Sequence, residues 1–358
     1  MQYIQEAFAR NWVAPLGFNC DGFEQELKVR LGDPAECCLL SLSSGTAALH
    51  LAVKLAGVKP GDVVLCSDMT FVATVNPVSY EGGIPVFVDS ERDTWNMDPA
   101  ALELAFEKYP QAKVVMLVHL YGTPARVDEI REICRRHHAV LIEDAAEALA
   151  SLYRGRHCGT LGDYSVFSFN GNKLITTSGG GMLITHSPEE RGTALKWATQ
   201  SREATPWYQH EQTGYNYRMS NIVAGIGRGQ LHHLAEHRER KAVIYRRYAQ
   251  GLAGLPVTMN PYLTDSEPNF WLSCMLIGEG CPVDPMKILE VLGENNVEAR
   301  PLWKPMHMQP LFAGRDFVTA GETAVDESLF RRGLCLPSDI KMTEAEQDYV
   351  IELIRSCF

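Results

Sequence analysis

The chain has 358 residues, of which 46% are hydrophobic and 22% are charged, a composition typical of folded globular proteins. Its length can hold two domains. The formal net charge of -11 argues against nucleic acid or anionic membrane surfaces as partners, because either requires a basic face. No apolar run is long enough to span a membrane, and the N-terminal segment MQYIQEAFARNW lacks a signal-peptide core, so we expect a cytoplasmic protein.

Short apolar runs alternate with amphipathic segments through the first two thirds of the chain. The apolar runs occupy residues 37–43, 62–68, 84–89, 113–122, 139–146, 164–169 and 180–185. Helical patterns fill several of the intervals, at 44–58, 98–109 and 126–138. Strands that alternate with helices of this length predict an α/β fold, with a mainly parallel sheet covered on both faces.

The pattern changes near residue 220. Residues 220–255 form long helical stretches, and a smaller mixed segment follows to the C-terminus. We therefore predict a large domain over residues 1–230 and a smaller C-terminal α/β domain over residues 231–358. In a parallel sheet, ligands bind at the carboxyl ends of the strands. Polar residues that directly follow the apolar runs are therefore the candidates for a site.

The first such candidate is SLSSGTAAL, which places Gly45 and Thr46 between a strand and an Ala/Leu-rich helix. Free backbone N–H groups, hydroxyls and the positive end of a helix suit a phosphate. A simple helix cap would use the same residues. Phe71 follows the next strand end in DMTFVAT, where its ring is either part of the core or able to stack on a flat cofactor.

The run LIEDAAEA places Glu143 and Asp144 at the end of a buried strand. Neighbouring strand positions face opposite ways, so at most one of these carboxylates points into a given site. Asp144 is either a helix cap or an anionic partner for a cationic ring nitrogen.

Lys173 stands in FSFNGNKLITTSGGGMLIT, between an aromatic run and a β-branched run. Most lysines lie on solvated surfaces, but the residues that follow this one are apolar or β-branched. Apolar surroundings favour the neutral amine, which is a nucleophile toward carbonyl groups. An amine, a carboxylate, a phosphate turn and an aromatic ring together predict pyridoxal phosphate as the cofactor.

No metal site is predicted. The ten cysteines include no metal-knuckle or C-x-x-C spacing, and several lie inside apolar runs, where a free thiol acts as a small hydrophobe. Of the eleven histidines, two pairs are adjacent residues on expected helix surfaces.

Three segments resemble a known family. EDAAEAL, FSFNGNKLITTSGGGML and GYNYRMSNIVAGIG are similar to signatures of the DegT/DnrJ-type nucleotide-sugar aminotransferases, which adopt the aspartate aminotransferase fold, fold type I. NWVAPLG, HLYG and RPLWKPMH further resemble the bacterial enzymes that aminate C4 of UDP-4-keto-6-deoxy-N-acetylglucosamine, in bacillosamine-type glycan biosynthesis used for protein glycosylation. Members of the family usually carry a further lead segment before the YIQEAF-like helix, so we expect substrate affinity to be affected here.

The resemblance implies a role for individual residues. Lys173 matches the lysine that forms the Schiff base with pyridoxal phosphate, and Asp144 matches the partner of the pyridine nitrogen. The other implied cofactor contacts are Glu147 near the ring, Ser168, Gly45 and Thr46 at the phosphate, Phe71 stacked on the ring, and Asn216 at the phosphate of the neighbouring subunit's cofactor. The Asn216 match implies a homodimer with shared active sites.

The contacts to the nucleotide sugar are expected from cations and an aromatic residue. A pyrophosphate needs local positive charge, for which the candidates are Arg218, Arg300, Lys304 and His307, and Trp303 is a candidate to pack against the sugar or base. L-Glutamate is the amino donor that the family implies. Alternative substrates are a GDP-linked 4-keto-6-deoxymannose and a 3-keto sugar.

Two other functions compete with transamination. A branch of the family that dehydrates its substrate has histidine in place of the lysine, so Lys173 argues against that activity. A non-catalytic binding or regulatory protein on the same fold is the second alternative, and the presence of both Lys173 and Asp144 argues against it.

Overall fold

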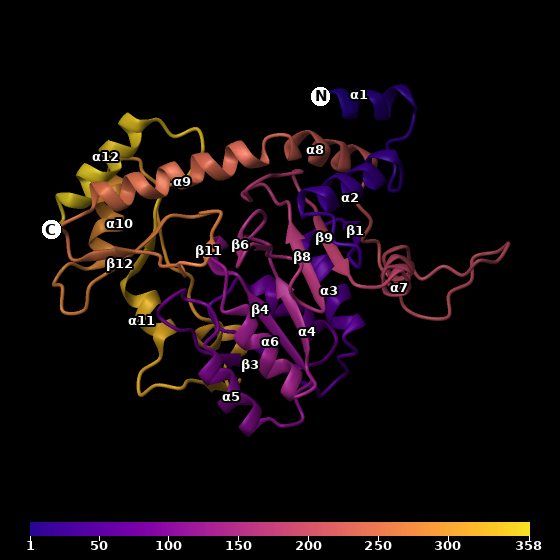
Figure 1. Ribbon diagram of the computed structural model, residues 1–358, viewed down its shortest axis with the longest axis horizontal. Helices are drawn as coiled ribbons and strands as arrows, with labels where there is room; N and C mark the ends of the chain where they lie inside the picture. The colour runs from indigo at the N-terminus through magenta and orange to yellow at the C-terminus, as the bar shows by residue number, and fades with distance from the viewer.

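The computed structural model describes residues 1–358, and its centre is an eight-stranded sheet in the order β1-β9-β8-β5-β4-β2-β3-β14 (Figure 1). Its strands are β1 (Cys38–Leu42), β2 (Val63–Ser67), β3 (Ile84–Val88), β4 (Val114–Val118), β5 (Val140–Asp144), β8 (Tyr164–Ser168), β9 (Gly181–Thr185) and β14 (Phe317–Val318). Neighbouring strands are parallel throughout, except that β9 is antiparallel to both β1 and β8. The predicted α/β fold with a mainly parallel sheet is confirmed.

Alternation along each strand explains why both faces of this sheet are covered. In β4, Val115 and Leu117 belong to one buried apolar cluster, whereas Val114 and Met116 belong to another on the opposite face. The helices around the sheet are α2 (Phe18–Arg30), α3 (Gly45–Leu55), α4 (Asn76–Tyr80), α5 (Pro99–Lys108), α6 (Val127–Arg136), α7 (Pro188–Ala198) and α8 (Asn221–Leu231). Helices α2, α5, α6 and α8 contribute to the first cluster, and α3, α4 and α7 contribute to the second. An outlying helix, α1 (Gln2–Ala9), packs against α8.

The C-terminal part is built on a four-stranded antiparallel sheet in the order β10-β12-β15-β13. Its strands are β10 (Val257–Met259), β12 (Cys274–Ile277), β13 (Arg300–Pro301) and β15 (Gly333–Cys335). The helices of this part are α9 (Leu234–Gly251), α10 (Pro285–Glu294), α11 (Val325–Arg332) and α12 (Glu344–Arg355). The long helix α9 leads from the end of α8 to this sheet (Figure 1). A third cluster of buried apolar side chains joins α9, α10 and α12 to strands β12 and β15.

Two connections bind the parts to each other. Strand β14 pairs with β3 at the edge of the large sheet, so a late segment of the chain completes the sheet of the early part. Strand β11 (Ser266–Glu267) pairs with β6 (Leu152–Tyr153), which pairs with β7 (Arg156–His157). The division that we predict at residue 230 falls just before the end of α8, and it stays a prediction. No helix is long and apolar enough to cross a membrane.

Candidate active site

The candidate site lies where β5 ends. Asp144 is the last residue of that strand and is 4% exposed. Its Oδ2 accepts a hydrogen bond from the Thr74 hydroxyl at 2.7 Å, and its Oδ1 accepts one from the Ala146 N–H at 3.0 Å. Burial raises the pKa of Asp144, while these two donors and the charge of Lys173 act in the opposite direction. The result is a buried carboxyl group held in one orientation at the carboxyl end of a central strand.

The neighbouring carboxylate, Glu143, serves a different purpose. Its oxygens accept hydrogen bonds from the side chains of His119 and Ser165 and from the backbone N–H groups of Gly159, Leu161 and Gly162. Together with Cys158, His119 and Glu143 offer three potential metal-binding atoms within 4.8 Å of one another. Both imidazole nitrogens of His119 are already engaged, Nε2 by Glu143 and Nδ1 by the Ala125 N–H. Glu143 is therefore a structural anchor for the loop that follows β7.

Lys173 lies in the loop between β8 and β9. The buried side chains of Leu174, Ile175 and Thr177 anchor the chain directly after it. The Lys173 Nζ atom lies 3.5 Å from Oε1 of Glu147, and its side chain is 13% exposed. The apolar residues of the motif therefore fix the loop, while the amine itself faces a carboxyl group in the interior.

Glu147 belongs to the turn that follows β5 and is 6% exposed. Its Oε2 accepts a hydrogen bond from the Tyr121 N–H at 2.7 Å. Tyr121 has a positive φ of 55°, a conformation that non-glycine residues rarely adopt. Burial raises the pKa of Glu147 to about 7, although Lys173 lowers it. Glu147 can therefore hold or release a proton near neutral pH, next to the lysine amine.

This raised pKa predicts a pH dependence of stability. Between the ordinary glutamate pKa of 4.5 and about 7, the folded protein keeps a proton that the unfolded chain has lost. The contribution of Glu147 to stability is therefore complete below 4.5 and is lost as pH rises through 7. We expect the cofactor-free protein to lose about 2–3 kcal/mol of unfolding free energy relative to Glu147→Gln between about pH 5 and about pH 8. Urea unfolding of both proteins at the two pH values measures this; parallel behaviour of the two proteins would contradict it.

A candidate phosphate-binding turn lies where α3 begins. The first N–H groups of a helix have no partner within the helix. Here the Ser44 hydroxyl accepts a hydrogen bond from the Ala47 N–H, and the N–H groups of Gly45 and Thr46 have no partners inside the helix. A Cβ atom at Gly45 would lie 2.9 Å from the Cβ of Ser168, so only glycine allows this close approach of α3 and the end of β8. Helix N-termini bind anions through such N–H groups. The structure thus brings Gly45, Thr46 and Ser168 together.

Arg218 lies beside the end of β1, the strand that leads into α3. Its backbone bridges to Leu42, the last residue of β1. The side chain is buried, and its Nε and Nη1 atoms have no hydrogen-bond partner within the chain. A buried guanidinium group without a partner is costly, because its desolvation is not offset. Arg218 is therefore suited to an anionic ligand.

Aromatic rings line the side of the site that faces the C-terminal part. The ring of Phe71 is 57% exposed, and its centroid lies 5.7 Å from that of Trp303. The Trp303 ring also lies 5.2 Å from the Tyr121 ring and 6.3 Å from the Trp271 ring. The Trp303 N–H donates a hydrogen bond to the Tyr121 hydroxyl at 2.9 Å. Phe71 and Trp303, both predicted from sequence, thus share one aromatic cluster with Tyr121 and Trp271.

The remaining predicted residues lie outside this group. Asn216 is exposed and bridges to Thr199, and it makes no hydrogen bond to Lys173, Asp144 or Glu147. Arg300 is exposed and paired with Glu298 at the rim of a cavity. The ring of His307 stacks on Phe317 with 4.1 Å between centroids. Its Nδ1 lies 2.5 Å from Oδ2 of Asp68, the residue that follows β2, and its Nε2 lies 3.6 Å from Glu327. His307 thus connects the C-terminal segment to the large sheet.

Three residues of the site were not predicted from sequence. Thr74 donates to Asp144, Tyr121 donates to Glu147, and Trp271 lies against Lys173. The sequence gives no local signal for Thr74 or Trp271, because their roles depend on contacts with distant segments. Tyr121 could have been found, since HLYG closes the predicted apolar run 113–122 and Tyr121 is a polar residue near its end.

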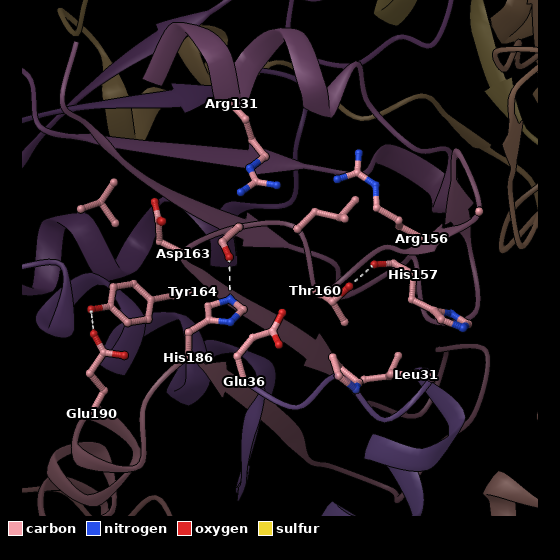
Figure 2. Close-up of a pocket in the computed structure, with 16 residues that line it drawn as sticks. Leu31, Glu36, Arg131, Arg156, His157, Thr160, Asp163, Tyr164, His186 and Glu190 are labelled. Carbon is pink, nitrogen blue, oxygen red and sulfur yellow. Dashed lines mark hydrogen bonds between the residues drawn. The ribbon is translucent and has the colours of Figure 1, made fainter. Parts of the chain in front are cut away.

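Two large cavities differ in their relation to this site. The larger, about 910 Å³, lies near the starts of β5 and β8, at the opposite edge of the sheet, and none of the predicted site residues lines it (Figure 2). Several of its polar groups already bond to one another, as the pairs Tyr164–Glu190 and His186–Gly162 show (Figure 2). A cavity of about 790 Å³ is lined by Asn172, next to Lys173, and by Trp271, Arg300 and Trp303. The cavity of about 790 Å³, rather than the one of about 910 Å³, therefore adjoins the candidate active site.

Known proteins resemble this chain over nearly its whole length. The sequence profile of the DegT/DnrJ/EryC1/StrS aminotransferase family matches residues 1–355. The chain is 47% identical to EpsN of Bacillus subtilis (strain 168), which is designated a pyridoxal phosphate-dependent aminotransferase, over 99% of this chain and 92% of that protein. It is 35% identical to the GDP-perosamine synthase of Caulobacter vibrioides, over 98% and 92% of the two chains.

Solved structures agree with the sequence relatives. A DegT DnrJ EryC1 StrS aminotransferase from Brucella abortus has a TM-score of 0.90 and 26% identity, over 99% of this chain and 94% of that chain. The aminotransferase TlmJ from Streptoalloteichus hindustanus has a TM-score of 0.90 and 29% identity over the same shares. The chain therefore belongs to the DegT/DnrJ/EryC1/StrS aminotransferase family.

Proposed function

We propose that this protein transfers an amino group from L-glutamate to C4 of UDP-4-keto-6-deoxy-N-acetylglucosamine, within a bacillosamine-type pathway. The protein is a pyridoxal phosphate-dependent sugar aminotransferase, as its family membership and its designated relatives indicate. The observation that carries the proposal is the Lys173 amine, which lies beside Glu147 at the edge of the sheet where Asp144 is buried.

The residues present fit the cofactor. Asp144 is a buried carboxyl group without a cationic partner of its own, as a pyridinium nitrogen requires. Gly45, Thr46 and Ser168 would hold the phosphate, and the backbone of Arg218, whose guanidinium has unpartnered nitrogens, bridges to the strand that leads into this turn. When bound, pyridoxal phosphate supplies an aldehyde carbon that carries the amino group and a ring that withdraws electrons from the reacting carbon.

The chain's own groups then account for binding and proton transfer. The Lys173 Nζ atom removes a proton from the α-carbon of glutamate and returns one to C4 of the sugar. Glu147, at 3.5 Å, provides a second proton-holding group near neutral pH. Asp144 would pair with the ring nitrogen of a bound cofactor, and the rings of Trp271 and Trp303 form an apolar wall on the side of the C-terminal part. Arg218, Arg300 and His307 stay candidates for the nucleotide.

A GDP-linked 4-keto-6-deoxymannose is the second candidate substrate. Three GDP-perosamine synthases are 32–35% identical to this chain over nearly its full length. The UDP-linked substrate is preferred because NWVAPLG and RPLWKPMH resemble the enzymes that use it.

Visible absorption spectroscopy tests the proposal. The cofactor-loaded protein should be yellow, L-glutamate should bleach the colour, and UDP-4-keto-6-deoxy-N-acetylglucosamine should restore it. Recovery with the GDP-linked 4-keto sugar alone would favour the second candidate. A protein that stays colourless after addition of pyridoxal phosphate would overturn both.

We further propose a cytoplasmic homodimer in which Asn216 reaches the cofactor phosphate of the partner subunit. Asn216 is exposed within its own chain and bridges to Thr199 through its backbone, so its side chain is accessible to a partner subunit. We expect Asn216→Ala to weaken cofactor binding about tenfold, because one hydrogen bond to a charged group is lost. Equilibrium dialysis measures it, with Gln250→Ala, an exposed amide on α9, as the control. Unchanged binding in a proven dimer would contradict the shared site.

A further inference from the structure

The indole ring of Trp271 forms a wall of the space around Lys173. The Lys173 Nζ atom lies 4.2 Å from the centroid of this ring, and Trp271 is 2% exposed. The face of an aromatic ring attracts a cation, most strongly for tryptophan and when water is excluded. The amine therefore has two partners, the Glu147 carboxyl group and the Trp271 ring.

The segment that carries Trp271 also forms hydrogen bonds to the backbone beside Lys173 and to the backbone of Glu147. The Trp271 Nε1–H donates to the backbone oxygen of Asn172, the residue before Lys173, at 2.7 Å. The Trp271 N–H donates to Oδ1 of Asn269, whose Nδ2 donates to the backbone oxygens of Glu147 at 2.7 Å and Leu149 at 2.9 Å. The indole is thus fixed relative to the lysine and to the glutamate at once.

A buried lysine secures this segment from the other side. Lys241 of α9 is 9% exposed, and its ammonium group donates to the backbone oxygens of Trp271, at 2.9 Å, and of Ser338. No carboxylate pairs with it, and burial lowers its pKa to about 8. An ammonium group buried on two carbonyl oxygens serves to hold those backbone segments together. Lys241 therefore links the Trp271 segment to the C-terminal part.

We propose that Trp271 is a positioning residue for Lys173, which holds the amine between the indole face and Glu147. This inference rests on the proposed function, in which the Lys173 amine captures the cofactor. A lysine side chain has four flexible carbon–carbon bonds, and ordering it costs conformational entropy. The rigid indole surface reduces the positions open to the amine before the cofactor arrives, so capture is faster.

The rate of covalent capture of pyridoxal phosphate by cofactor-free protein tests this role. Capture is stopped with borohydride, and the modified lysine is located by peptide mass. We expect Trp271→Leu to slow capture at Lys173 about tenfold and Trp271→Phe about threefold, since phenylalanine retains a rigid ring surface but lacks the Nε1–H that bonds to Asn172. Trp95→Phe is the matched control, because Trp95 is 3% exposed in the same apolar cluster and has no lysine over its ring. This control should capture at the wild-type rate.

The possible outcomes separate this inference from the proposed function. Urea unfolding establishes that each variant is folded, and the graded effect of Trp271→Phe against Trp95→Phe remains decisive if Trp271→Leu does not fold. Capture at the wild-type rate in folded Trp271 variants would overturn the positioning role alone. Failure of the wild-type protein to capture the cofactor at Lys173 would overturn the proposed function and this inference with it.

Discussion

Replacement of Lys173 by alanine should lower kcat by about 10⁴-fold or more and abolish the yellow colour of the cofactor-loaded protein. In the proposed mechanism the amine both captures the cofactor and moves the two protons, so we expect a single substitution to remove two functions. Lys173, at 3.5 Å, is the only amine within 4.0 Å of the Glu147 carboxyl group, so no neighbouring amine is placed to substitute for it.

Two comparisons separate the loss of the amine from the loss of its charge. Lys173→Arg retains a cation against Glu147 and Trp271 but cannot capture the cofactor, so it should be as inactive as Lys173→Ala. A small added amine such as methylamine should restore part of the activity of Lys173→Ala, because the space that the side chain leaves is open to it. Absorbance and single-turnover formation of 2-oxoglutarate measure these effects. Full turnover by Lys173→Ala would overturn the assignment.

The second large effect is expected at Asp144. Asparagine has nearly the same shape but cannot carry the negative charge that keeps a ring nitrogen protonated. We expect Asp144→Asn to lower kcat by about 10²–10³-fold, comparable to the loss of one electrostatic group at a reacting centre. The Thr74 hydroxyl and the Ala146 N–H hold this carboxyl in place. Thr74→Val should therefore produce a smaller decrease in the same direction.

Glu143→Gln is the matched control for Asp144→Asn, since the two acids are neighbours on one strand. Glu143 accepts hydrogen bonds from the loop after β7 and from His119, and none from the Asp144 contacts. Its replacement should lower the unfolding free energy by about 3 kcal/mol and change kcat less than about tenfold. Steady-state kinetics and urea unfolding of both variants test the contrast. A larger loss of kcat in Glu143→Gln would show that the wrong acid was assigned.

Much of the large sheet could be predicted from the sequence. The seven apolar runs in the first two thirds of the chain correspond to β1, β2, β3, β4, β5, β8 and β9. Their continuous apolar character reflects burial on both faces of the sheet. Strand β14 could not be predicted, because two residues, Phe317 and Val318, carry no periodicity. Its position depends on pairing with β3, more than two hundred residues earlier in the chain.

Some residues of the candidate site could also be predicted from the sequence, whereas others depend on contacts between distant segments. Ser168 and Asp144 end their strands and Gly45 follows β1 by three residues, so the topology of a parallel sheet was enough to predict them at one side of the sheet. The proximity of Lys173 and Glu147 depends on the loop after β8, which Leu174 and Ile175 anchor. Trp271 reaches Lys173 from nearly one hundred residues away, through hydrogen bonds that no local pattern reveals.

The late arrival of β14 has a consequence for how the chain folds during synthesis. Until residue 318 leaves the ribosome, β3 is the edge strand of the large sheet, and its segment IPVFV presents unpaired backbone groups flanked by apolar side chains. Unpaired apolar edges are templates for aggregation, and contacts between distant segments form slowly. A nascent chain that pauses near residue 230 would hold seven of the eight strands with this edge open. Translation speed and chaperone supply over the last third of the chain should therefore govern its yield.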